Sequence, residues 1–110
     1  MNQPAANATN LPAREVYQRL KDVCLGTATA RRHGQQNWND VHSGLVTIDI
    51  DGWLITLNKE AGTLDYCAAC TTPDGRHADM HSWAERGTDP LELLSVWERG
   101  RLEAALEALR

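Results

Sequence analysis

Two alternating runs of apolar and polar residues around Asp51-Gly52 constrain the fold more than any other feature of this 110-residue chain. An Asp-Gly pair favours a two-residue type I′ turn between antiparallel strands. A shift of one residue would bury Asp49, so the turn and the hydrophobic pattern predict one register. That register has the cross-strand pairs Ile50–Trp53, Ile48–Ile55 and Val46–Leu57, with all six side chains on one face.

A third strand is predicted from Thr63 onward, after a turn through residues 59–62. The sequence Thr72-Pro73-Asp74-Gly75 is typical of a turn, and residues 76–80 are predicted to return as a short fourth strand. The register that extends the apolar face of the hairpin consists of the pairs Leu64–Leu57, Tyr66–Ile55 and Ala68–Trp53.

Helical periodicity is present on both sides of the strands. Apolar residues recur at helical spacing after Pro12, and Gly26 is suited to end that helix. Asp89-Pro90 supplies an N-cap and a first helical residue for a long terminal helix, with a bend or a change of contact partner predicted near Gly100. Residues 27–43 show no clear repeat and are predicted to form a long loop.

These elements predict an α+β domain in the order α-β-β-β-α, or α-β-β-β-β-α if the fourth strand forms. The antiparallel sheet would have three or four strands, with the N- and C-terminal helices packed on one face. Residues 1–10 are predicted to be a disordered tail and residues 11–110 a single domain.

Charge and hydropathy narrow the functional classes. A formal net charge of −4 gives no overall positive field, so nucleic acid is not an expected partner. No apolar run is long enough to span a bilayer, and the first residues do not resemble a signal peptide, so no membrane partner is expected and a cytoplasmic location is predicted. Three cysteines in such a chain argue for free thiols or a metal rather than disulfides.

A candidate zinc site consists of Cys67, Cys70, His77, Asp79 and His81, in the spacing C-x2-C-x6-H-x3-H. Thiolate and imidazole ligands suit zinc, but the spacing between the two pairs is shorter than in finger-type sites. In a regular strand Cys67 would point outward and Cys70 into the core, so the two could not share one ion. We therefore favour Cys70 as a small core residue and expect no cofactor, with zinc bound by these five residues as the alternative.

Enzymatic chemistry is less well supported than binding. The Cys-x-x-Cys pair lies in a predicted strand rather than at a helix N-terminus, which disfavours redox catalysis. Asp40, His42 and Ser43 are sequence neighbours without a nucleophile-elbow pattern, so they are not predicted to form a catalytic triad.

The chain contains four tryptophans and no phenylalanine. Tryptophan is favoured at interfaces because it combines a large apolar area with a polar N–H group. Trp53 is assigned to the core, while Trp38 and Trp97 are candidate binding residues for a protein partner or for a second copy in a homodimer. In the alternative, these tryptophans cover the edges of a small core.

Several segments resemble a family of small uncharacterised Pseudomonas proteins, and the likeness covers most of the chain. That family has no assigned activity, so the resemblance implies a bacterial cytosolic protein and adds no catalytic residue. We predict a non-enzymatic interaction or regulatory module, with a metal-binding protein as the alternative. The segments that carry the resemblance are residues 44–58, Leu64-Asp65-Tyr66-Cys67, Pro73-Asp74-Gly75-Arg76, Asp89-Pro90-Leu91 and Leu94-Ser95.

Overall fold

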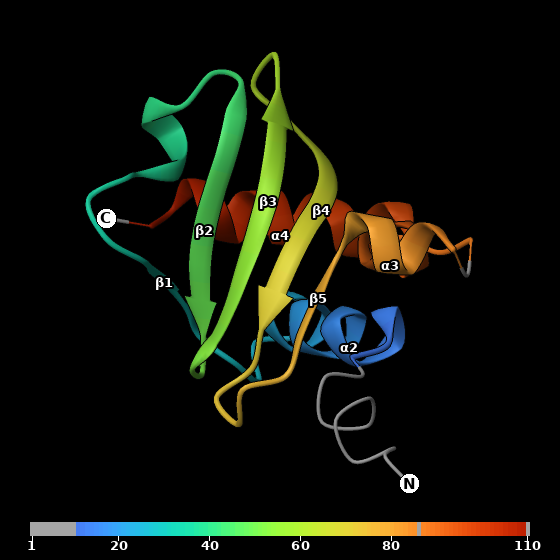
Figure 1. The fold of residues 1–110 in the computed structure, drawn as a ribbon. Helices are drawn as coiled ribbons and strands as arrows, with labels where there is room; N and C mark the ends of the chain where they lie inside the picture. Colours follow the sequence, from blue (N-terminus) through green and yellow to red (C-terminus); the bar gives the residue numbers. More distant parts are fainter. Residues whose placement is uncertain (1–10, 86, 110) are drawn as a thin grey trace, which may run out of the picture.

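A five-stranded antiparallel sheet with the strand order β1-β2-β3-β4-β5 forms the centre of the computed structural model (Figure 1). The structure describes residues 11–85 and 87–109, so the tail predicted at residues 1–10 lies outside the described residues. The strands are β1 (Ala30–Arg32), β2 (Gly44–Ile50), β3 (Trp53–Glu60), β4 (Thr63–Thr71) and β5 (His77–Asp79). The helices are α2 (Ala13–Cys24), α3 (Met80–Ala84) and α4 (Val96–Glu107), with 3-10 turns η1 (Trp38–Asp40) and η2 (Pro90–Leu93).

The β2–β3 hairpin has the predicted register, with Ile50 opposite Trp53 and Ile48 opposite Ile55. Asp51 and Gly52 have φ values of 52° and 89°, as a type I′ turn requires. The Asp49 carboxylate accepts a hydrogen bond from the Gly52 N–H at 2.8 Å, which closes the turn. The turn residues and the alternation of apolar side chains therefore specify the same register for this hairpin.

The predicted register of β4 is wrong, because β3 continues to Glu60 and β4 contains two β-bulges. A two-residue turn at Ala61 and Gly62 pairs Leu64 with Lys59 instead of Leu57. Asp65 and Ala68 are extra residues without a partner in β3, and each bulge shifts the side-chain alternation by one position. The buried residues of β4 therefore recur at every third position, namely Leu64, Cys67 and Cys70.

Tyr66 consequently lies away from the predicted core face. It pairs with Asn58 on the opposite side of the sheet and is only half-buried. Polar pairs follow this outer face: the hydroxyls of Thr47 and Thr56 are 2.7 Å apart, and Asn58 donates to Asp65 at 3.2 Å. The outer face of the central strands is thus largely polar.

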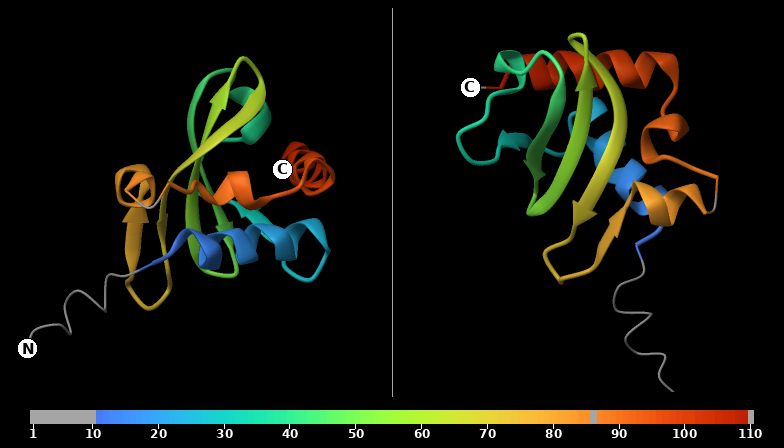
Figure 2. Two further views of the ribbon diagram at one scale, coloured as in Figure 1. Left: turned by 90° about the vertical axis from the view of Figure 1, so that its right-hand side faces the viewer. Right: turned by 45° about the horizontal axis from the view of Figure 1, so that its top comes forward.

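Helices α2 and α4 cover the inner face of the sheet together, as Figure 2 shows. The sheet and the two helices share one core, and α2 ends as predicted, with Gly26 at a φ of 80°. The largest fully buried side chains are Trp38, Leu20, Ile48, Ile50, Ile55, Leu57, Leu64, Leu91, Leu102, Leu106, Val16 and Val46.

The segment predicted as one long terminal helix is divided before α4 rather than at Gly100. Asp89 caps the short turn η2, and Leu94 leaves the helical conformation with a ψ of 140°. Ser95 then begins α4, which continues through Gly100 to Glu107. The break follows from two consecutive capping boxes, Asp89–Glu92 and Ser95–Glu98, each of which starts a new helix.

The predicted loop at residues 27–43 contains β1, which is the strand that the sequence did not predict, and the 3-10 turn η1. In β1, Ala30 pairs with Ile50 and Arg32 with Ile48. The three residues of β1 are too few to show a two-residue alternation in the sequence. Their assignment to a strand depends on their pairing with the edge of β2.

In the part of the chain that the structure describes, no strand covers the outer edge of the first half of β4, because β5 pairs only with residues 69–71. The side chain of Asp89, the N-cap of η2, and two side chains of α4 satisfy this edge instead, across 22 to 39 residues of sequence. The hydrogen bonds are Cys67 N to Asp89 Oδ2 at 3.2 Å, Leu64 N to Glu103 Oε2 at 3.0 Å, and Arg99 Nη2 to the carbonyl oxygens of Leu64 and Asp65 at 2.9 Å.

Candidate interaction surface

Helix α4 begins with a complete capping box. The Ser95 hydroxyl accepts the Glu98 N–H at 3.1 Å, and the Glu98 carboxylate accepts the Ser95 N–H at 2.9 Å. On the inner side, Leu102 and Leu106 are fully buried in the core. The capping box and these two leucines together fix which side of α4 faces outward.

The opposite side of α4 is exposed and weakly polar. With about 100° of rotation per residue, positions 97, 100, 101, 104 and 108 share one side of the helix, away from Leu102 and Leu106. We call these five residues the outer face of α4: Trp97, Gly100, Arg101, Ala104 and Ala108.

Trp97 is the dominant side chain of this outer face. Its side chain is 60% exposed, and the preceding Val96 is 91% exposed. The Arg101 guanidinium lies 5.5 Å from the centroid of the Trp97 ring, which is within cation–π distance. Two adjacent exposed apolar residues on a rigid helix are typical of an interaction surface.

Trp38, the other candidate binding residue, has a different place. Its side chain is only 2% exposed, because η1 carries it into the core. The Lys59 ammonium lies 4.7 Å from its ring centroid. A buried ring of this kind supports the fold and offers no surface to a partner in this conformation.

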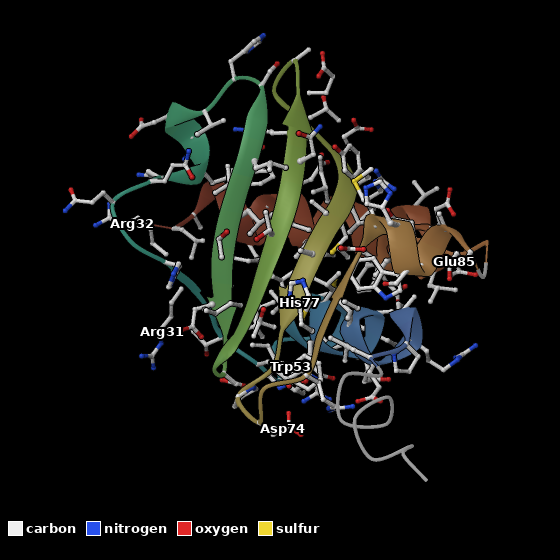
Figure 3. All side chains as sticks on the ribbon, in the orientation of Figure 1. Arg31, Arg32, Trp53, Asp74, His77 and Glu85 are labelled. Carbon is white, nitrogen blue, oxygen red and sulfur yellow. The ribbon has the colours of Figure 1, made fainter. Side chains whose placement is uncertain are left out.

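The five candidate zinc ligands are divided between separate environments, which corrects the predicted grouping. The bulge at Ala68 turns both Cys67 and Cys70 into the core, so Cys67 does not point outward as expected. His77 is exposed on β5 (Figure 3), and its Nδ1 lies 2.9 Å from the Thr71 hydroxyl. Asp79 caps α3 and accepts the N–H groups of residues 81 and 82. Within residues 11–85 and 87–109, no group of three or more His, Cys, Asp or Glu side chains could hold a metal ion.

The two buried thiols of β4 are held in the neutral form. Burial raises the pKa of Cys70 to about 12. Burial also raises the pKa of Cys67 well above its ordinary value, and the nearby Asp89 and Cys70 add to this rise. Because the thiolate is the reactive and metal-binding form, these side chains behave as small apolar residues of the core.

The fold and this surface define an α+β domain with a five-stranded antiparallel sheet and an exposed helix face. A family model described as "Domain of unknown function (DUF7693)" matches residues 10–108, and the chain belongs to this family. The predicted resemblance to an uncharacterised family is confirmed at this level, and a restriction to Pseudomonas stays a prediction. Searches of curated proteins and of solved structures found no match.

No helix of the described residues has the length and apolar character needed to cross a membrane. The predicted cytoplasmic location and the predicted absence of nucleic-acid and membrane partners stay predictions.

Sequence reasoning identified Trp97 but missed the rest of the outer face of α4. Gly100, Ala104 and Ala108 are small residues spaced by four, a signal that is visible in the sequence once the helix boundaries are known. The sequence does not predict their exposure, because its apolar pattern favours one longer helix with a drifting apolar side.

Proposed function

We propose that this chain is a non-enzymatic interaction module that forms a homodimer through the outer face of α4. The observation that carries the proposal is the adjacent exposure of Val96 and Trp97 on a helix whose other side is anchored in the core. Burying an indole in a contact removes a large apolar area from water, and tryptophan is enriched among residues that dominate binding energy.

Self-association is favoured over another partner because the outer face is self-complementary in shape. A two-fold contact requires one patch to fit itself. The patch contains one large apolar side chain, Trp97, with Arg101 over its ring, and along the same side it contains the small residues Gly100 and Ala104. In an antiparallel contact centred between positions 100 and 101, Trp97 of each copy lies opposite Ala104 of the other.

Light scattering after size exclusion, over a series of protein concentrations, tests this contact. We expect a dimer that dissociates on dilution, and Trp97→Ala should raise the dissociation constant about tenfold or more. Ala104→Trp should weaken the dimer as well, because two bulky rings would then oppose each other. The double variant Trp97→Ala/Ala104→Trp restores a bulky residue opposite a small one and should recover dimerisation.

Leu45→Ala is the matched control, because Leu45 is an exposed apolar residue on β2, outside α4. It should leave the dissociation constant unchanged. Thermal unfolding of each variant at a concentration where all are monomeric should give nearly the same midpoint. A wild-type protein that is monomeric at every concentration, or a dimer that Trp97→Ala leaves intact, would contradict the proposal.

A further inference from the structure

A cavity of about 360 Å³ lies between α3, the outer side of β4 and the segment that leads into η2. Its volume is within the range of sites that bind small molecules. The walls are Tyr66, Met80, Trp83, Ala84, Gly87, Thr88, Asp89 and Glu92.

The apolar wall of the cavity is fixed by features described above. The bulges of β4 turn Tyr66 to the outer side, and the Asp79–Ser82 capping box sets the start of α3, which carries Met80 and Trp83. Trp83 is anchored by its Nε1–H, which donates to the Leu11 carbonyl at 3.0 Å. Two aromatic rings and a thioether therefore line a preformed space.

The polar wall of the same cavity consists of two carboxylates, Asp89 and Glu92. Asp89 Oδ1 accepts the Leu91 N–H at 2.8 Å and Oδ2 accepts the Cys67 N–H at 3.2 Å. Glu92 Oε1 accepts the Asp89 N–H at 3.4 Å. These hydrogen bonds orient both groups, and a carboxylate oxygen has a second lone pair for a further donor.

Within residues 11–85 and 87–109, the negative charge of this wall is poorly compensated. Among the described residues, neither Asp89 nor Glu92 forms an ion pair. Burial raises the pKa of Asp89, and the charge of Glu92 adds to the rise. The hydrogen bonds from the Leu91 and Cys67 N–H groups lower this pKa, and the Arg99 charge lowers it least. The Arg99 guanidinium is engaged with the carbonyl oxygens of β4.

We propose that this cavity binds a small organic cation, an ammonium group attached to an apolar body. The ammonium would donate to Asp89 and Glu92, and the apolar body would lie against Tyr66, Met80 and Trp83. Charge-assisted hydrogen bonds and cation–π contact are the interactions that this combination of walls provides.

The neighbouring cavity supports the choice of a cation over a zwitterion or an anion. That cavity, of about 200 Å³, shares Trp83 and Thr88 with the first and is lined by Arg14. Among the described residues, the acidic and basic groups therefore line separate spaces, and the charged residues that line the larger space, Asp89 and Glu92, are both carboxylates.

Titration of ¹⁵N-labelled protein with 2-phenylethylammonium tests the proposal, with neutral 2-phenylethanol and anionic phenylacetate as matched probes. We expect chemical-shift changes at the Trp83 indole N–H and at the amides of residues 66 and 89. The ammonium probe should bind about tenfold more tightly than the alcohol, and phenylacetate more weakly than either.

Two variants distinguish a cation site from a merely apolar hollow. Glu92→Gln keeps an acceptor for the capping box but removes a charge. It should weaken binding of the ammonium probe about fivefold and leave binding of the alcohol unchanged. Glu60→Gln removes an exposed charge at the end of β3 and should change neither. Equal binding of ammonium and alcohol, an unaffected Glu92→Gln variant, or no shifts at these residues would each overturn the proposal.

Discussion

The Lys59 ammonium lies over the Trp38 indole ring, 4.7 Å from its centroid, and donates to the Trp38 backbone carbonyl at 2.6 Å. The Lys59 side chain is only 5% exposed. This one lysine therefore joins the end of β3 to η1 and keeps a buried carbonyl hydrogen-bonded.

Replacing Lys59 with Met tests this contact. The variant keeps an apolar side chain of similar length but removes the charge-assisted hydrogen bond to the Trp38 carbonyl, which then accepts only the Val41 N–H at 3.3 Å. We therefore expect a loss of about 1–3 kcal/mol in the free energy of unfolding. Urea denaturation measures it. Lys21→Met is the control, because the contacts of Lys21 are at the surface, 4.0 Å from the Glu98 carboxylate and 5.7 Å from the centroid of the Tyr17 ring. This variant should change stability by less than about 1 kcal/mol. Equal effects in the two variants would contradict the assignment.

The parts of the fold that the sequence predicted are those governed by local patterns. The β2–β3 register and the end of α2 at Gly26 follow from turn chemistry and periodicity within a few residues. The bulges at Asp65 and Ala68 leave no such signal, because alanine and aspartate are compatible with regular strands. Whether Cys67 pointed inward or outward depended on those bulges, so the candidate zinc site could not be judged from spacing alone.

The exposed helix face was only partly predictable for a related reason. Trp97 was expected to lie off the apolar stripe, and the structure agrees. Trp38 occurs in a segment without periodicity, and its carbonyl accepts a hydrogen bond from Lys59, which lies 21 residues away in the sequence. A contact over that distance has no local pattern.

Gly100→Ala should stabilise the folded monomer. Gly100 lies inside α4, its φ is not in the left-handed region, and an added Cβ would meet no atom within 4 Å. Alanine loses less backbone entropy in a helix, so we expect a gain of about 0.5–1 kcal/mol. Thermal and urea unfolding at low concentration give the value. A loss of stability would indicate that α4 bends at this position, as the sequence alone suggested.

The stability of the protein should depend on pH through Asp89. Burial raises the pKa of Asp89 above its ordinary value of 3.8, so just above 3.8 the folded state binds more protons than the unfolded state. The contribution of Asp89 to stability therefore falls as pH rises from its unfolded pKa to its higher folded pKa, and it levels off above the folded pKa.

Urea unfolding of wild type and Asp89→Asn from about pH 3.5 to about pH 7 isolates this contribution, because the other carboxylates cancel in the difference. The free energy of unfolding of wild type minus that of the variant should decrease with rising pH. A difference that stays constant or increases would show that hydrogen bonds to the charged form outweigh burial.

All three cysteines should react slowly in the native protein. Burial is the largest cause of the raised pKa at Cys24, Cys67 and Cys70, and at Cys70 the value reaches about 12. At about pH 8, labelling by iodoacetamide should be at least about a hundredfold slower than in denaturant, where mass spectrometry should find every cysteine modified. One rapidly modified cysteine in the native state would identify an opening of the core at that residue.

Glu103 should be needed as a hydrogen-bond acceptor rather than as a charge. Its carboxylate accepts the Leu64 N–H at 3.0 Å. Glu103→Ala should accelerate hydrogen exchange of the Leu64 amide and cost about 1 kcal/mol of stability. Glu103→Gln retains an acceptor and should behave nearly as wild type, whereas equal exchange rates in both variants would contradict this role.

The edge of β4 has a consequence for which sequences can keep this fold in solution. An uncovered strand edge is where one chain can add to another and start an aggregate. Here Asp89, Arg99 and Glu103 occupy that edge from within the same chain, although in the sequence Asp89 resembles a helix cap and the other two resemble ordinary surface charges. Substitutions at these three positions would therefore lead first to inclusion bodies and poor expression.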